Sequence, residues 1–179
     1  MEVSVLSFSG RANGNCAAIA QEIAEQYADA AVYSFAGQAF HPCGPCQAEC
    51  FQDRAACPYA DDGIAALYHA VLRSGLSYFV VPNYCDYPCS QFFLFNERSQ
   101  CVFQGLPQLL DAYLAVPKRF VVVSNTGRNN FVEAFKQHAP EPDILFLSAK
   151  RYGKTSLRGD LMDAPQARED LRAYVCRKV

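Results

Sequence analysis

The chain has 179 residues, and 51% of them are hydrophobic, enough to bury the core of one domain. We therefore expect a single domain over residues 1–179, with a cysteine-rich insertion loop at about 36–60. A formal net charge of only −2 argues against a nucleic-acid partner, and the absence of a long apolar run argues against a membrane span. Nine cysteines in a chain without a recognisable export signal favour the reducing cytoplasm.

Short apolar runs alternate with segments of helical periodicity along the chain. The runs predict five strands, at residues 3–6, 31–34, 76–81, 120–123 and 144–147. The periodic segments predict helices at residues 16–27, 64–72, 90–100 and 128–138, with a last helix opened by Pro165. Strands that are apolar throughout and alternate with helices indicate a parallel sheet covered on both faces. The expected class is α/β with strand order 2-1-3-4-5, and a ligand is expected where the first and third strands end.

The turn between the first strand and the first helix, residues 7–16, is rich in Gly, Ser and Asn. The free N–H groups of a helix start and the positive end of its dipole meet at such a turn. Arg11 can add a bidentate pair to a phosphate. We interpret the turn as a seat for a phosphate monoester. The alternative is that Asn13 or Asn15 is only an N-cap and that the glycines only relieve the turn.

This turn resembles the phosphate loop of flavodoxin-like NAD(P)H-dependent FMN reductases and iron-sulfur flavoproteins, which commonly reads Gly-Ser-x-Arg-x-x-Gly-Asn-Thr. Phe8 stands where Gly is usual, and Cys16 stands where Thr or Ser is usual. The resemblance implies a flavodoxin-like three-layer sandwich, with a five-stranded parallel sheet between two layers of helices. It also implies that FMN is bound through its phosphate by Ser9, Arg11, Asn13, Gly14, Asn15 and Cys16.

Two further turns resemble the loops that hold the flavin ring in this family. Pro82 and Tyr84 match Ser-Pro-x-Tyr, and the turn that starts at Ser124 is similar to Ser/Thr-x-Gly-Gly. From the residues alone, both could be ordinary surface turns. The resemblance implies contacts with the ring from Pro82, Asn83, Tyr84, Cys85, Asp86, Ser124, Asn125, Thr126 and Gly127.

Four cysteines follow the second strand with the spacing Cys-x2-Cys-x3-Cys-x6-Cys. Four thiolates on one loop can hold an iron-sulfur cubane or a tetrahedral zinc, or they can remain without a metal. Iron-sulfur flavoproteins hold a [4Fe-4S] cluster on a similar run at this place, although its middle gap is one residue shorter. The resemblance therefore implies that the metal ligands are Cys43, Cys46, Cys50 and Cys57.

The other cysteines suggest less. Cys85 and Cys89 are read as two small, half-buried residues, with a redox role beside the ring as the alternative. Cys101 and Cys176 are read as residues that pack on helix faces. Asp61 and Asp62 are read as a helix cap.

The expected function is that of an FMN-binding flavoprotein, an NAD(P)H-dependent oxidoreductase that passes electrons through FMN to a small acceptor or a [4Fe-4S] cluster. Because the flavin itself performs this chemistry, no catalytic side chain is expected. The acceptor is a small molecule or a redox protein, and the resemblance implies a homodimer or higher oligomer. The alternatives are a non-catalytic electron carrier and a flavin-free interaction domain braced by a metal or by disulfides.

Overall fold

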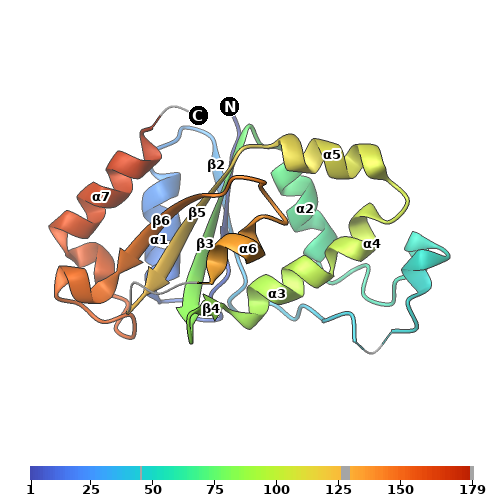
Figure 1. Ribbon diagram of the computed structural model, residues 1–179, viewed down its shortest axis with the longest axis horizontal. Helices are drawn as coiled ribbons and strands as arrows, with labels where there is room; N and C mark the ends of the chain where they lie inside the picture. The colour runs from blue at the N-terminus through green and yellow to red at the C-terminus, as the bar shows by residue number, and fades with distance from the viewer. Residues whose placement is uncertain (45, 126–129, 178–179) are drawn as a thin grey trace.

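The computed structural model describes residues 1–44, 46–125 and 130–177. Five parallel strands form the centre of the molecule (Figure 1), in the order β2-β1-β3-β5-β6. Their bounds are β1 (Val3–Ser7), β2 (Ala30–Ser34), β3 (Leu76–Tyr84), β5 (Lys118–Ser124) and β6 (Asp143–Ser148). If only these five parallel strands are numbered along the chain, and β4 is left out, this is the order 2-1-3-4-5 that the sequence predicted.

All five parallel strands are longer than predicted, and β3 extends furthest beyond its expected end. We expected it to end at Pro82, but β3 continues to Tyr84 and turns back into the two-residue strand β4 (Tyr87–Pro88). Pro82 breaks no ladder bond here. The carbonyl of Val80 accepts a hydrogen bond from the N–H of Phe8, the residue that follows β1. Pro82 lies two residues further along β3 and faces the same side, where β1 has already ended.

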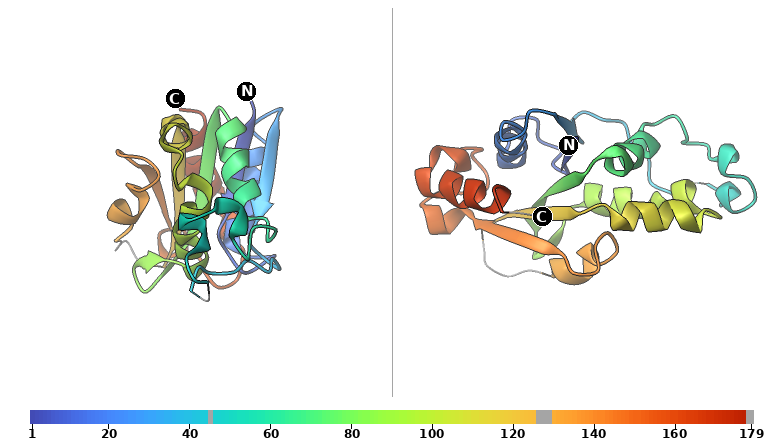
Figure 2. Two further views of the ribbon diagram at one scale, coloured as in Figure 1. Left: turned by 90° about the vertical axis from the view of Figure 1, so that its right-hand side faces the viewer. Right: turned by 90° about the horizontal axis from the view of Figure 1, so that it is seen from above.

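Helices cover both faces of the sheet, so the molecule has three layers (Figures 1 and 2). On one face lie α1 (Asn15–Ala24) and α7 (Pro165–Val175), beside the short 3₁₀ helices η3 (Ala149–Tyr152) and η4 (Leu161–Asp163). On the other face lie α2 (Ile64–Arg73), α3 (Ser90–Glu97), α4 (Ser99–Phe103), α5 (Pro107–Ala115) and α6 (Phe131–Phe135). Among the described residues, no helix combines the length and the apolar character needed to cross a membrane.

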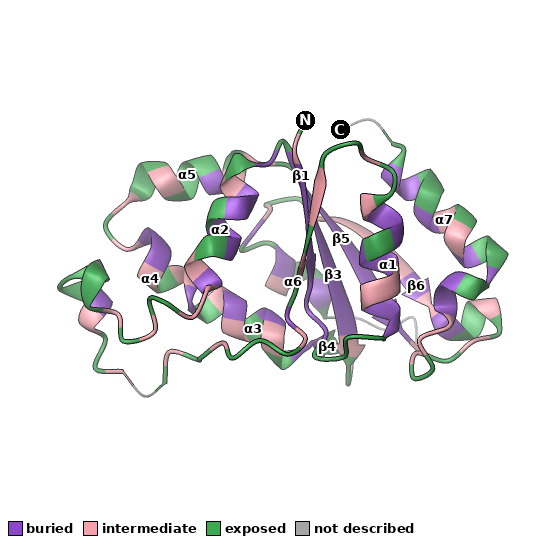
Figure 3. Ribbon diagram, turned by 180° about the vertical axis from the view of Figure 1, so that it is seen from behind, coloured by how far each residue is buried: buried purple, intermediate pink, exposed green. Residues whose placement is uncertain are grey.

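The sheet is buried on both sides because its residues alternate between two apolar cores. In β3, Tyr78 and Val80 pack toward α1 and α7, whereas Phe79 and Val81 pack toward the other helices. Figure 3 shows the resulting buried centre of the sheet, whereas the edge strand β2 is only partly buried.

The helices of the second layer depart from the prediction. The single helix expected over 90–100 is two helices, α3 and α4, which meet at Arg98. Phe92 and Phe95 are buried as expected, but Phe93 is 44% exposed. Helix α5, which starts at Pro107, was not predicted. Of the helix expected over 128–138, the described part is the short α6, and residues 128–129 lie outside the described residues.

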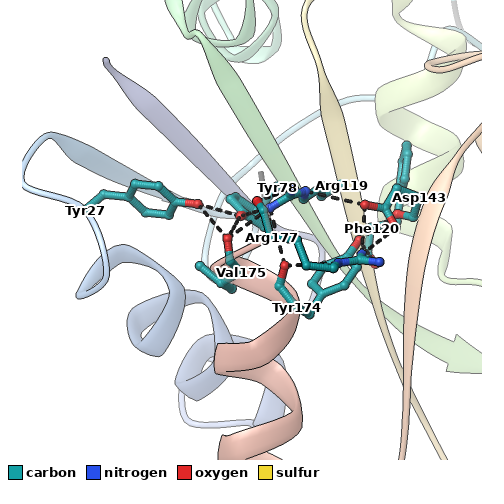
Figure 4. Close-up of polar contacts among 8 residues, drawn as sticks. All are labelled: Tyr27, Tyr78, Arg119, Phe120, Asp143, Tyr174, Val175 and Arg177. Carbon is teal, nitrogen blue, oxygen red and sulfur yellow. Dashed lines mark hydrogen bonds and ion pairs between the residues drawn. The ribbon is translucent and has the colours of Figure 1, made fainter. Parts of the chain in front are cut away.

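A polar network closes the sheet edge where the strands begin (Figure 4). Arg119, at the start of β5, donates to the carbonyl oxygens of Val175 and Arg177, at 3.0 and 2.7 Å. Its Nε also lies 3.4 Å from a carboxylate oxygen of Asp143. A buried cation thus caps the carboxyl end of α7 and ties it to the sheet. This edge is occupied by structural contacts, whereas the opposite edge carries the predicted loops.

Candidate functional site

The loop after β1 and the ends of β3 and β5 meet at the edge of the sheet where the strands end. They enclose a cavity of about 50 Å³, room for a phosphate-sized group but not for a flavin ring. Residues 153–161, near the other end of the chain, contribute Ser156 and Leu157 to the wall of the cavity. We call these residues the covering segment. The lining residues are Ser9, Arg11, Gly14, Asn15, Cys16, Pro82, Asn83, Tyr84, Val123, Ser156 and Leu157.

The start of α1 is open toward this cavity. Its N-cap residue is Gly14, which offers no side-chain cap. The first intrahelical bond runs from the N–H of Ala18 to the carbonyl of Gly14, so the N–H groups before Ala18 have no helical acceptor. The alternative in which an asparagine caps this helix is therefore wrong, because Asn15 is the first helical residue and its side chain binds elsewhere. These amides and the Arg11 guanidinium together suit an anion.

The covering segment is bonded directly to the phosphate loop. The Arg11 guanidinium donates to the carbonyl of Leu157. The Asn15 amide nitrogen donates to the carbonyl of Ser156 at 3.2 Å, and the Ser156 N–H donates to Asn125 Oδ1 at 2.8 Å. The covering segment thus joins the phosphate loop to Asn125, the residue after β5. The sequence did not predict this role of the covering segment.

Gly159 explains how this segment comes so close. Its φ of +79° lies in the left-handed region, and a Cβ at this position would stand 2.7 Å from the carbonyl oxygen of Asn13. Only glycine fits this approach without a shift of the backbone. A single glycine in an irregular segment gave no motif from which the contact could have been predicted.

The turn after β3, which we call the ring loop because the resemblance implies contacts with the flavin ring, forms a tight hairpin. Cys85 and Asp86 have φ values of 53° and 66°, as the two central residues of a type I′ turn require. The turn leaves Tyr84 52% exposed at the rim of the cavity. The Asp86 carbonyl accepts a hydrogen bond from the N–H of Asn130 at 2.9 Å, which joins the hairpin to the segment before α6.

The loop after β5 is only partly described. The Asn83 amide donates to Ser124 Oγ at 2.9 Å, so the ends of β3 and β5 are tied together beside the cavity. Thr126 and Gly127, both expected at the ring, lie outside the described residues. The expected residues that do not line the cavity are Asn13, Cys85, Asp86, Ser124 and Asn125.

The two departures from the family's loop have different consequences. Phe8 points away from the loop and into the core, with its ring 4.7 Å from that of Phe35 and 5.4 Å from that of Phe79. Cys16 lines the cavity, and burial raises the pKa of its thiol well above the ordinary value, so it is neutral. The cavity therefore keeps its positive character.

The cysteines of the ring loop differ from each other. The reading of Cys85 and Cys89 as two half-buried residues is wrong for both, because Cys85 is exposed and Cys89 is 1% exposed. The Cys89 thiol donates to the carbonyl of Phe8 at 3.0 Å and thereby joins α3 to the phosphate loop.

The cysteine-rich segment runs away from this cavity toward the outer end of α4 (Figure 1). Cys43, Cys46 and Cys50 line one hollow of about 450 Å³ beside α3 and α4. Cys57, the fourth expected ligand, instead faces Cys101, with 3.6 Å between the two sulfur atoms. Within the described ranges, no three Cys, His, Asp or Glu side chains are placed to hold one metal ion. The four-cysteine metal site therefore stays a prediction.

Arg98 fastens this segment to the helices. It is 2% exposed, and it donates to the carbonyls of His41 and Tyr59 at 2.7 and 2.9 Å. Its guanidinium also pairs with Asp62, with 2.5 Å between Nη1 and Oδ2. Burial alone would raise the pKa of Asp62, but the bonds from Arg98 and from the backbone N–H groups of His41 and Ile64 lower it. The N-cap residue of α2 is Gly63 rather than Asp61 or Asp62. The Asp62 carboxylate instead accepts a hydrogen bond from the N–H of Ile64 at 3.1 Å and neutralises a buried cation.

A larger hollow, of about 550 Å³, lies at the opposite edge of the sheet. Its two buried cations already bond to the protein, since Lys118 donates to the carbonyls of Tyr113 and Val116, and Arg119 caps α7. In a doubly wound sheet, ligands bind beyond the carboxyl ends of the strands. Chemistry and topology therefore both favour the smaller cavity.

No protein-family model matches this sequence, and no curated protein is significantly similar to it. Among solved structures, a Trp repressor binding protein from Bacillus subtilis matches 98% of this chain and 100% of its own, with 14% identity and a TM-score of 0.68. The fold is flavodoxin-like. An oxidoreductase from Corynebacterium diphtheriae shares this flavodoxin-like arrangement over 99% of this chain and 98% of its own, with 12% identity and a TM-score of 0.50.

Proposed function

We propose that this flavodoxin-like chain binds FMN, with the phosphate in the cavity between the phosphate loop and the covering segment. The observation that carries the proposal is the placement of Arg11 and the uncapped start of α1 on one small cavity at the switch point of the sheet. Arg11 would exchange its bond to the Leu157 carbonyl for a charge-assisted pair with the phosphate.

The isoalloxazine ring would lie outside the cavity, along the hairpin after β3. Tyr84 stands exposed at the rim, where it can cover a face of the ring, and the hairpin backbone can bond to the ring's polar edge. FMN, when bound, supplies hydride and electron transfer, so that the protein has only to hold, orient and shield it. No side-chain acid or base is assigned to a catalytic role.

We further propose that the protein is an oxidoreductase with NADH or NADPH as donor and a small molecule or redox protein as acceptor. In line with the family resemblance, we propose a homodimer or higher oligomer working in the cytoplasm. Mixing the FMN-loaded protein with each pyridine nucleotide under anaerobic conditions tests the donor. Rapid bleaching of the flavin absorption by NADH or NADPH supports the proposal. If neither nucleotide bleaches the flavin faster than it bleaches in a sample without nucleotide, the protein is an electron carrier instead.

The proposed [4Fe-4S] ligands are Cys43, Cys46, Cys50 and Cys57. Three of them already share a hollow, and Cys57 would have to turn from Cys101 toward it. Metal and sulfide analysis of anaerobically prepared protein decides the question. About four irons per chain support the cluster. One zinc per chain, or no metal with all four thiols free to react, contradicts it.

The phosphate site is tested by Arg11→Ala, with Arg73→Ala as the matched control, since Arg73 is an exposed arginine at the end of α2. Losing one charge-assisted pair, worth on the order of 1.5–3 kcal/mol, should weaken FMN binding roughly 10- to 100-fold. The control should bind FMN as the parent does. Equal FMN affinity in the two variants would place the phosphate elsewhere.

A further inference from the structure

Two thiols from distant parts of the chain face each other outside the proposed flavin site. Cys57 follows the 3₁₀ helix η2 (Arg54–Ala56) in the cysteine-rich segment, and Cys101 lies in α4. Their sulfur atoms are 3.6 Å apart, and both residues are half-buried, within reach of a small molecule. A disulfide bond is about 2.05 Å long, so the sulfurs need to approach by only about 1.5 Å.

The structure holds the pair in place from both sides. Arg98, one turn before Cys101, donates to the carbonyl of Tyr59, which lies two residues after Cys57. The same guanidinium forms the buried ion pair with Asp62. The segment around Cys57 therefore cannot leave α4 unless a buried charge pair is broken, which is costly. Once one sulfur has been oxidised, a thiol held at contact distance attacks it as if at high concentration.

The two sulfurs have different surroundings. The Arg98 Nε donates to the sulfur of Cys101 at 3.4 Å, and an adjacent guanidinium is a setting typical of nucleophilic cysteines. The Cys57 thiol in turn donates to the sulfur of Cys101 at 3.6 Å. Cys101 is thus suited to attack first and Cys57 to attack second.

The third nearby thiol is less suited to take part. This thiol belongs to Cys43, which is anchored to the end of α3. Its thiol donates to the carbonyl of Glu97 at 3.5 Å, and its N–H bonds to the Glu97 carboxylate at 3.2 Å. Cys43 is therefore held against Glu97.

We propose that Cys57 and Cys101 form a redox-active dithiol that a hydroperoxide oxidises to a disulfide. The sulfur of Cys101 attacks one peroxide oxygen, the O–O bond breaks, and a sulfenic acid forms while the first water or alcohol leaves. The sulfur of Cys57 then attacks the Cys101 sulfur, the S–O bond breaks, and a second water leaves. The two thiols lose two electrons, which the peroxide gains.

The disulfide would have a defined structural effect. It would fasten the cysteine-rich segment covalently to α4, at the point where Arg98 already joins them. If the proposed metal ligands are correct, it would also withdraw Cys57 from the metal. The dithiol itself does not depend on the flavin proposal, because no residue of the pair lines the phosphate cavity.

The test uses fully reduced, flavin-free protein treated with hydrogen peroxide and then with an alkylating agent. Non-reducing peptide mapping should show one linked species that contains Cys57 and Cys101. Free thiols should fall from the nine cysteines of the chain to seven, since two are consumed. Cys176→Ser, at an exposed position beyond α7, is the matched control and should form the same link.

Single replacements separate the two roles. In Cys57→Ser, Cys101 should accumulate as a sulfenic acid that a dimedone-type probe traps. In Cys101→Ser, Cys57 should stay open to alkylation after the same treatment. The proposal is overturned if Cys57 and Cys101 of the parent remain fully alkylated, or if Cys101 is linked mainly to Cys43. Because no flavin is present, neither result depends on whether the chain binds FMN.

Discussion

Asn15 Oδ1 accepts a hydrogen bond from the backbone N–H of Leu161 at 2.9 Å, across 146 residues of sequence. The other end of the same amide donates to Ser156. One side chain at the first turn of α1 therefore binds the covering segment at two points, Ser156 and Leu161. The asparagine that looked like a helix cap instead joins the two walls of the cavity.

Replacing Asn15 tests this joint. Asn15→Asp keeps an acceptor for Leu161 but turns a carboxylate oxygen toward the Ser156 carbonyl and adds negative charge beside the phosphate site. Losing the bond to Ser156 should lower the free energy of unfolding by about 1–3 kcal/mol. FMN affinity should fall at least roughly 10-fold, the equivalent of about 1.4 kcal/mol. Denaturant unfolding and FMN titration measure the two effects, and a variant that matches the parent in both would contradict this role.

Gly159→Ala tests the close approach of the covering segment, and Gly153→Ala is a matched control. Both glycines have positive φ, of 79° and 66°, so both substitutions carry similar backbone strain. Only at Gly159 would the new Cβ meet the backbone of Asn13, whereas nothing lies within 4 Å of it at Gly153. We expect FMN affinity to fall clearly more in Gly159→Ala than in Gly153→Ala. If FMN affinity falls equally in the two variants, backbone strain alone explains the loss, and the close approach to Asn13 does not affect binding.

His138 predicts a pH dependence of stability. Burial, and then the nearby Lys118, lowers its pKa to about 3 from an ordinary value of 6.5. Below pH 6.5 the unfolded chain binds a proton that the folded chain does not. Stability contributed by neutral His138 is therefore complete above pH 6.5 and is lost as the pH falls toward 3, at up to about 1.4 kcal/mol per pH unit.

His138→Phe should flatten this dependence between pH 6.5 and about 5. The ring sits among Phe79, Phe92 and Phe95. Among the described residues its Nε2 has no hydrogen-bond partner, so an aromatic hydrocarbon suits the site apart from the lost bond to Tyr113. His69→Phe, at an exposed position, is the control and should keep the slope of the parent. Urea unfolding at several pH values measures it, and parallel curves for the parent and His138→Phe would refute the assignment.

The sequence predicted the parallel sheet well, because fully buried strands such as β5 contain an unbroken apolar run, here residues 120–123. It predicted the helices of the second layer less well. Phe93 follows Phe92 directly, and neighbouring helical residues cannot both face the core, yet composition alone made the whole run look buried. The break at Arg98 depends on a buried ion pair with Asp62, which no local pattern reveals.

The phosphate loop was predictable for a similar reason, since its residues are consecutive and share one helix start. The covering segment was not, because its contacts depend on backbone atoms of Ser156, Leu157 and Leu161 rather than on distinctive side chains. Cys101 was read as a packing residue because it lies 44 positions from Cys57, its partner. Contacts that form only in the tertiary structure have no characteristic residue spacing in the sequence from which they could be predicted.

The most direct test of the account compares FMN with riboflavin as ligands of the unmodified protein, by calorimetric titration under one set of conditions. The two ligands share the ring and differ by the phosphate. If the phosphate binds in the cavity lined by Arg11 and the start of α1, FMN should bind at least roughly 100-fold more tightly than riboflavin. This ratio is equivalent to about 2.7 kcal/mol. Equal affinities, or binding of neither ligand, would contradict the central claim.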